Sequence, residues 1–136
     1  MCYTGLRYSD AIRFNSSLHI VGGKRIVVVT QKTKKETNLY INDKIRPLAD
    51  FVNDHRIYIT QIDFNRKLKV IAAGAGINKN VSSHVARHSF GSSLVDLGIT
   101  IEVAKGLLSH GSTSSIKIYY HLKSANLDEA MKKFNK

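Results

Sequence analysis

The hydrophobic pattern of this 136-residue chain changes character at Ile41, and this change constrains the fold more than any other feature. Between Leu18 and Ile41, apolar residues come in short runs rich in β-branched side chains, separated by glycines or lysines. After Ile41, apolar residues recur every three or four positions, which is typical of amphipathic helices. A chain of this length buries one core. The sequence therefore predicts a single α+β domain that is mostly helical and carries a small antiparallel sheet.

Three strands are expected in the first part of the chain, over Leu18–Val21, Ile26–Thr30 and Thr37–Ile41. Gly22-Gly23 predicts a tight turn between the first two, because glycine readily adopts the positive φ angles of such turns. The second turn, Lys32-Thr33-Lys34-Lys35, has no glycine and carries three ammonium groups at its tip. Such a tip is either simply solvated or placed to reach a ligand.

Capping residues mark the expected helices. A short helix runs from Asp10 through Phe14 with Ser9 as its cap, and a second starts at Asn42 or Asp43, with Pro47 in its first turn. The remaining helices are expected to start at the Thr60–Asp63 capping box, at Ser82 or Ser83, at Thr100, at Ser112 and at Ser124, with Gly74, Gly98 and Gly111 ending three of them.

Charge is the first indication of function. Lysine and arginine number 21 against 10 acidic residues, a formal net charge of +11, which favours a polyanionic partner such as nucleic acid. A basic surface that only keeps the protein in solution stays open from composition alone. The sequence has no apolar run of roughly 18 residues and no secretory signal pattern, so a cytoplasmic protein is expected. The single cysteine, Cys2, cannot form an internal disulfide.

Four short motifs follow one another along the chain. They are Thr4-Gly5-Leu6-Arg7-Tyr8-Ser9-Asp10, then Gln31-Lys32-Thr33-Lys34 between two strands, then Ser83-His84-Val85-Ala86-Arg87-His88-Ser89-Phe90, and last Leu107-Leu108-Ser109-His110 followed by Ile118-Tyr119-Tyr120-His121. Each motif alone is weak, but their ordered occurrence is a strong signal. Together they resemble the catalytic domain of the tyrosine recombinase, or phage integrase, family. Ser109 in place of the usual glycine is a small departure.

The resemblance covers residues 1–136 and implies the fold of these catalytic domains and of type IB topoisomerases. It implies site-specific recombination, with metal-independent DNA cleavage and rejoining through a 3′-phosphotyrosine. The implied partner is double-stranded DNA. Self-association is implied as a tetramer on DNA in the full-length protein. The apolar stripe of the C-terminal helix is most simply core packing, and the resemblance suggests docking on a neighbouring subunit as the alternative. A core-binding, DNA-binding domain is expected to precede this chain. The protein would be nucleoid-associated in a prokaryotic cell or encoded by a mobile element.

The chemistry of phosphodiester cleavage assigns a role to each motif. Two guanidinium forks, Arg7 and Arg87, suit the non-bridging oxygens of a phosphate that gains negative charge. Two imidazoles, His84 and His110, can donate hydrogen bonds to these oxygens and exchange protons near neutral pH. Lys32, on the strand turn, is the first choice for the general acid that protonates the leaving hydroxyl.

The nucleophile is predicted to be Tyr119. A phenol, with an ordinary pKa of about 10, becomes a feasible nucleophile when a positive cluster favours its phenolate form. Tyr119 and Tyr120 cannot both face one phosphate, because neighbours on a helix point about 100° apart. The resemblance places the nucleophile nine positions after His110, which selects Tyr119. Tyr120 is then core-facing or DNA-facing.

Four further residues receive supporting roles. Asp10 is expected to orient Arg7 through an ion pair, and His88 to support the neighbouring arginine structurally. Lys34 and Lys35 are expected to contact the DNA backbone or to remain solvated.

Two other functions stay open from the sequence. One is a DNA-binding module without catalysis, and the other is a ribonuclease with His84 and His110 as an acid–base pair. A zinc site is not expected, because the histidines lack cysteine partners and the glutamate of H-E-x-x-H, and the arginines would repel a cation. No cofactor is predicted.

Overall fold

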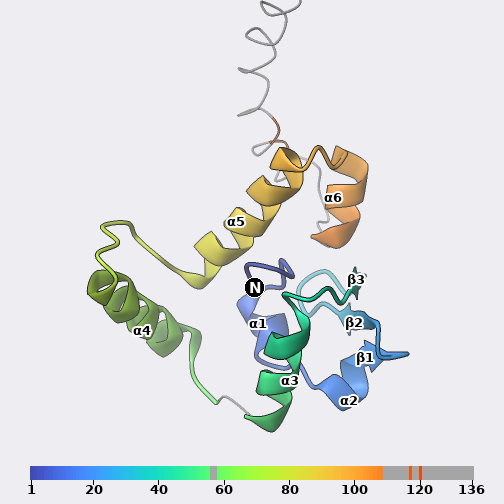
Figure 1. The fold of residues 1–136 in the computed structure, drawn as a ribbon, viewed down its shortest axis with the longest axis horizontal. Coiled ribbons are helices and arrows are strands. Elements are labelled where there is room, and N and C mark those ends of the chain that lie inside the picture. Colours follow the sequence, from blue (N-terminus) through green and yellow to red (C-terminus); the bar gives the residue numbers. More distant parts are fainter. Residues whose placement is uncertain (56–57, 109–116, 118–119, 121–136) are drawn as a thin grey trace, which may run out of the picture.

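The computed structural model describes residues 1–55, 58–108, 117 and 120 (Figure 1). Its elements in chain order are α1 Tyr8–Ala11, α2 Ser16–His19, β1 Ile20–Val21, β2 Arg25–Val29, β3 Glu36–Tyr40, α3 Arg46–Asp54, α4 Gln61–Gly74, α5 Ser83–Asp96 and α6 Ile101–Leu107. The sheet lies among α1, α2 and α3, while α5 and α6 form a pair beside it and α4 stands to one side (Figure 1). The predicted α+β class is confirmed.

The sheet has three antiparallel strands in the order β1-β2-β3. Side chains of β2 and β3 alternate between a buried and an exposed face, and the buried residue Ile26 faces Leu39 across the strand pair. Gly22 and Gly23 have φ angles of +56° and +64°, so the first turn is of the kind predicted. The sheet therefore buries one face, as the alternation of its sequence requires.

The predicted strand over Leu18–Val21 is wrong in its first half. Leu18 and His19 belong to α2, and only Ile20 and Val21 pair with β2. The side chain of Asn15 accepts a hydrogen bond from the N–H of Ser17 at 2.9 Å and caps a helical turn there. A local cap thus outweighs the strand propensity of the apolar run.

The first helix also begins earlier than predicted. The backbone N–H groups of Asp10 and Ala11 bond to the carbonyl of Arg7 at 3.1 and 2.8 Å, so the helix starts at Tyr8 with Arg7 at its N-cap. The Ser9 cap is therefore wrong. Arg7 nevertheless lies at a helix N-terminus, as expected.

The later helices follow their predicted signals closely. Thr60 Oγ accepts the N–H of Asp63 at 3.1 Å at the start of α4, and Ser82 Oγ caps α5. Gly98, with φ at +73°, ends α5. The third helix starts later than expected, at Arg46, because Asn42 caps the turn that precedes it.

Two apolar clusters hold the described residues together. One lies between α5 and α6 and the other beneath the sheet, and Leu107 packs against both. Their buried members are Leu94, Val95, Ala104 and Leu108 in the first and Ile26, Val28, Leu39, Ile41 and Ile45 in the second. Helix α6 therefore ties the helix pair to the sheet. The helices predicted to start at Ser112 and Ser124 lie outside the described residues, and none of the described helices is long and apolar enough to span a bilayer.

Candidate active site

Three of the predicted catalytic residues, Arg7, His84 and Arg87, line one small cavity of about 100 Å³. Arg7 is the N-cap of α1, and the other two come from the start of α5. The remaining lining residues are Met1, Tyr8, Ser9, Gln61 and Ser83. Pockets for drug-sized ligands measure roughly 300–1,000 Å³. This cavity therefore suits a small group such as a phosphate.

Arg87 builds the cavity as well as lining it. It is 8% exposed, and its guanidinium donates hydrogen bonds to the backbone carbonyls of Gly5 and Leu108. These bonds fasten the N-terminal loop and the end of α6 to α5. Gly5 sits so close that a Cβ there would lie 2.5 Å from the ring of Phe90. Because it has no side chain, the glycine of the first motif allows the segment that carries Arg7 to pack closely against α5.

Arg7 brings an unused donor to this cavity. Its Nη1 is buried, and no described residue accepts a hydrogen bond from it. A buried donor without an acceptor costs about 1–3 kcal/mol, and more for a charged group. An anion in the cavity would satisfy this nitrogen.

The expected ion pair between Asp10 and Arg7 is wrong. Within the described part of the chain, Asp10 pairs with no cation, and its Oδ1 instead accepts the backbone N–H of Gln31 at 2.8 Å. Asp10 is 2% exposed, and its Oδ2 is buried without a described partner. The donor comes from the turn between β2 and β3, to which Gln31 belongs. Asp10 therefore supports the lysine turn.

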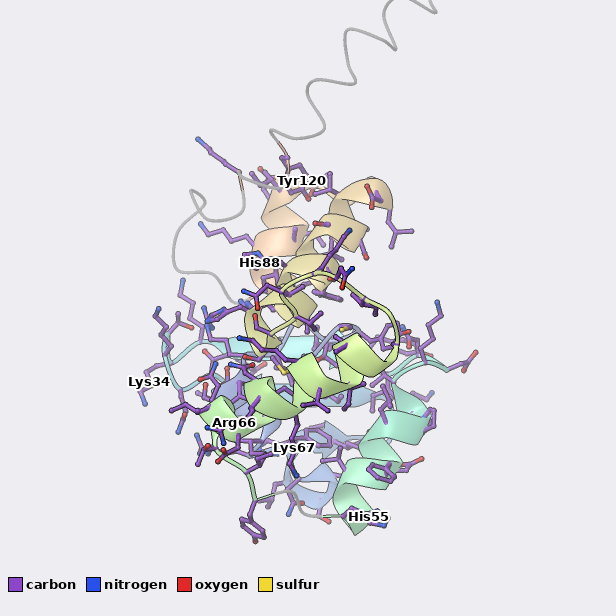
Figure 2. All side chains as sticks on the ribbon, turned by 90° about the vertical axis from the view of Figure 1, so that its left-hand side faces the viewer. Lys34, His55, Arg66, Lys67, His88 and Tyr120 are labelled. Carbon is purple, nitrogen blue, oxygen red and sulfur yellow. The ribbon has the colours of Figure 1, made fainter. Side chains whose placement is uncertain are left out.

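The lysine turn is ordered by its threonines and carries exposed cations. The hydroxyls of Thr30 and Thr33 lie 2.7 Å apart, and the N–H of Lys34 bonds to the Thr30 carbonyl at 3.0 Å. Lys34 has a φ of +54°, which closes the turn without glycine, and it lies at the outer edge in Figure 2. Lys32 and Lys35 are also exposed. Lys32 does not line the cavity.

The Tyr120 side chain packs against the apolar core. Its hydroxyl donates to the carbonyl of Ile99, and its ring packs against the cluster between α5 and α6 (Figure 2). Burial raises the pKa of the Tyr120 phenol, and the nearby carboxylate of Glu102 raises it further. Tyr120 thus takes the core-facing place expected of one of the two adjacent tyrosines.

Two of the predicted catalytic residues, His110 and Tyr119, lie outside the described residues. His88 is exposed on α5 (Figure 2), and its supporting role stays a prediction. Among the described residues, no three His, Cys, Asp or Glu side chains gather as a metal-binding group.

Sequence reasoning missed two polar residues of this cavity, one from the start of α4 and one from the start of α5. Gln61 and Ser83 line it, although the sequence indicated only a helix start near each. Tyr8, also in the lining, donates from its hydroxyl to the carbonyl of Ile59 just before α4. No local pattern marks these contacts, because the residues are far apart along the chain.

Comparison with known proteins agrees with the motifs and the fold. The family model described as "Phage integrase family" matches residues 1–126. Tyrosine recombinase XerD of Lacticaseibacillus casei is 32% identical over an alignment 145 residues long. The alignment covers 93% of this chain and 50% of that protein. The chain thus spans about half the length of the curated relatives it matches.

Solved structures show the same fold. The crystal structure of XerA recombinase superposes with a TM-score of 0.76 at 22% identity, covering 99% of this chain and 55% of that one. XerH recombinase, in a post-cleavage complex with its difH substrate, has a TM-score of 0.74 at 18% identity, covering 99% and 44%. By its motifs, its fold and the match over residues 1–126, the chain belongs to the phage integrase family, that is, to the tyrosine recombinases.

Proposed function

We propose that this chain cleaves and rejoins double-stranded DNA as the catalytic part of a site-specific recombinase. The observation that carries this proposal is the small cavity lined by Arg7, His84 and Arg87, in which Arg7 has a buried and unsatisfied N–H donor. Two permanently charged forks and an imidazole match the oxygens of a phosphodiester. The net charge of +11 favours association with the DNA backbone.

In the proposed reaction, Tyr119 attacks the scissile phosphorus while Arg7 and Arg87 stabilise the charge on its non-bridging oxygens. The new bond joins phosphorus to the phenolic oxygen, and the bond from phosphorus to the 5′ oxygen breaks. The phenolic proton passes to a histidine, His84 or His110, and Lys32 protonates the departing 5′ oxygen. A 5′-hydroxyl from another strand reverses these steps, so no nucleotide cofactor is consumed.

The lysine turn suits the role of a mobile general acid. Its backbone is held by Thr30 and Asp10, and the Lys32 side chain is exposed. DNA bound over the cavity would bring a leaving group to this ammonium. Lys34 and Lys35 then contact the backbone phosphates.

DNA as the partner is supported by a structural neighbour, because the XerH recombinase is described bound to its difH substrate. A tetramer on DNA and a preceding DNA-binding domain stay predictions, as does a location at the nucleoid. An isolated catalytic part should bind DNA weakly and with strong salt dependence.

The test is covalent trapping. The chain is incubated in EDTA with a pool of nicked suicide duplexes with randomised flanking sequence, in which a short 5′-hydroxyl fragment diffuses away after cleavage. Protein–DNA adducts are then read on a denaturing gel. We expect adducts with the wild-type chain and with Tyr120→Phe, and none with Tyr119→Phe.

Three results would contradict the proposal, in whole or in its choice of nucleophile. A wild-type chain that binds DNA but forms no adduct would be a binding module. Cleavage that requires a 2′-hydroxyl and leaves no adduct would identify a ribonuclease. Adducts that persist in Tyr119→Phe and vanish in Tyr120→Phe would overturn the choice of nucleophile.

A further inference from the structure

A buried hydroxyl lies beside the proposed phosphate clamp. Ser83 is the first residue of α5, is 1% exposed, and lines the cavity together with Arg7, His84 and Arg87. Neither the motifs nor the proposed mechanism gives this residue a role. A polar group this buried is expected to have a partner for each of its hydrogen-bonding atoms.

Helix α4 fixes Ser83 from two sides. Gln61 Nε2 donates to the Ser83 hydroxyl oxygen at 3.0 Å, and the Ser83 backbone N–H donates to Asn65 Oδ1 at 2.9 Å. Both ends of the Gln61–Ser83 bond belong to residues that line the cavity. The first turn of α5, which carries His84, is therefore held against α4 by these two amides.

The Ser83 hydroxyl still has a proton to donate. A serine hydroxyl carries one donor and two acceptor lone pairs, and the bond from Gln61 uses only a lone pair. No described residue accepts the hydroxyl proton of Ser83. A hydroxyl that accepts one hydrogen bond is also polarised toward donating another.

We propose that Ser83 is a further catalytic residue, whose hydroxyl donates a hydrogen bond to a non-bridging oxygen of the scissile phosphate. Gln61 is the positioning residue that directs this hydroxyl into the cavity. The proposal rests on the function proposed above, since it needs a phosphate between Arg7 and Arg87. The bond strengthens as the phosphorus becomes five-coordinate, because negative charge grows on that oxygen.

The experiment removes the donor and the acceptor in turn. A site recovered from the trapped pool is synthesised with an ordinary scissile phosphate and with a methylphosphonate in each of its two diastereomers, which replaces one non-bridging oxygen by a methyl group. Single-turnover adduct formation is measured for the wild type, Ser83→Ala, Gln61→Ala and Ser92→Ala. Ser92, exposed on the same helix and outside the cavity lining, is the matched control.

Ser83→Ala should slow cleavage of the ordinary phosphate about 10-fold, below the ~100–1,000-fold cost of losing an oxyanion-hole donor, because two guanidinium groups share the charge. On the diastereomer that lacks the contacted oxygen, Ser83→Ala should cause no further slowing. Gln61→Ala should show the same pattern at about 3-fold, because the hydroxyl remains but loses its orientation. Ser92→Ala should match the wild type.

Equal slowing of all three substrates by Ser83→Ala would mean that Ser83 acts through the fold, and the proposal would be wrong. An unchanged rate on the ordinary phosphate would also overturn it. If thermal denaturation shows that Ser83→Ala does not fold, the exposed Gln61 decides the question by the same comparison of substrates. A wild-type chain without adducts would instead refute the proposed function, and this inference with it.

Discussion

The buried carboxylate of Asp10 accepts a hydrogen bond from the backbone N–H of Gln31, with an N···O distance of 2.8 Å. Asp10 lies on α1, three positions after Arg7, and Gln31 directly precedes Lys32. One carboxylate thus bonds the helix that carries the proposed clamp to the turn that carries the proposed general acid. This bond therefore links the position of the lysine turn to that of α1.

Replacing Asp10 should therefore weaken both stability and cleavage. Asp10→Ala leaves the Gln31 N–H without its acceptor and should lower the free energy of unfolding by about 1–3 kcal/mol. Asp10→Asn retains an acceptor oxygen and should lose less. Urea unfolding measures the stability and single-turnover adduct formation measures the rate. An Asp10→Ala variant as stable as the wild type would show that the bond contributes nothing.

Substitution of Arg7 and of Arg87 by lysine should change the stability of the protein by different amounts. Arg87 bridges the carbonyls of Gly5 and Leu108, and lysine cannot form this fork, so Arg87→Lys should cost about 3 kcal/mol of stability. No described residue accepts a hydrogen bond from Arg7 Nη1, so Arg7→Lys breaks no bond there and should cost much less stability than Arg87→Lys.

Both lysine variants should lose adduct formation, since the planar fork suits phosphate oxygens. Urea unfolding and the trapping assay, applied to the same preparations, separate the two roles. Equal destabilisation by the two substitutions would contradict the assignment of Arg87 as the residue that also builds the cavity.

Gly5→Ala should destabilise the protein by about 3 kcal/mol. The new Cβ would lie 2.5 Å from the Phe90 ring and 3.0 Å from Leu108, at a φ of +62°. Gly23→Ala is the matched control, because its φ is +64° but nothing lies within 4 Å of the added Cβ. The control should lose only about 1 kcal/mol, from backbone strain alone. Thermal and urea unfolding of both variants measure the difference, and equal losses would rule out the clash.

The protein should lose stability in alkali through Tyr8. Burial raises the pKa of its phenol above the ordinary 10.0, with a further rise from Asp63. The unfolded chain then releases this proton at a lower pH than the folded protein does. The stabilising contribution is complete below about pH 10 and is lost as the pH rises through the folded pKa.

Urea unfolding between about pH 9 and about pH 11 should show a shallower fall in stability for Tyr8→Phe than for the wild type. The variant also lacks the bond to the Ile59 carbonyl, which lowers its stability equally at every pH in this range where Tyr8 is protonated. The slope with pH, rather than the absolute stability, is therefore the quantity to compare. Identical slopes would contradict the raised pKa.

Features that depend on a few neighbouring residues were predictable from the sequence. The capping box at Thr60, the helix start at Ser82 and the Gly22-Gly23 turn all appear as expected. Each of them is formed by residues no more than a few positions apart, so the local sequence pattern is enough to predict it. The four motifs likewise identified the family, because their order and spacing belong to the chain itself.

Contacts between distant segments were decided by the tertiary structure. Asp10 was expected to pair with the nearby Arg7, but it accepts the Gln31 N–H from the turn between β2 and β3, a contact that no local pattern reveals. The sequence indicated Ser83 only as a possible helix start. The hydrogen bond from Gln61 forms because α4 packs against the start of α5. The sequence by itself determined which chemical groups the chain carries and where its helices and turns begin. The packed fold decided which of those groups share a cavity, because burial and hydrogen-bond geometry depend on segments that meet only in three dimensions.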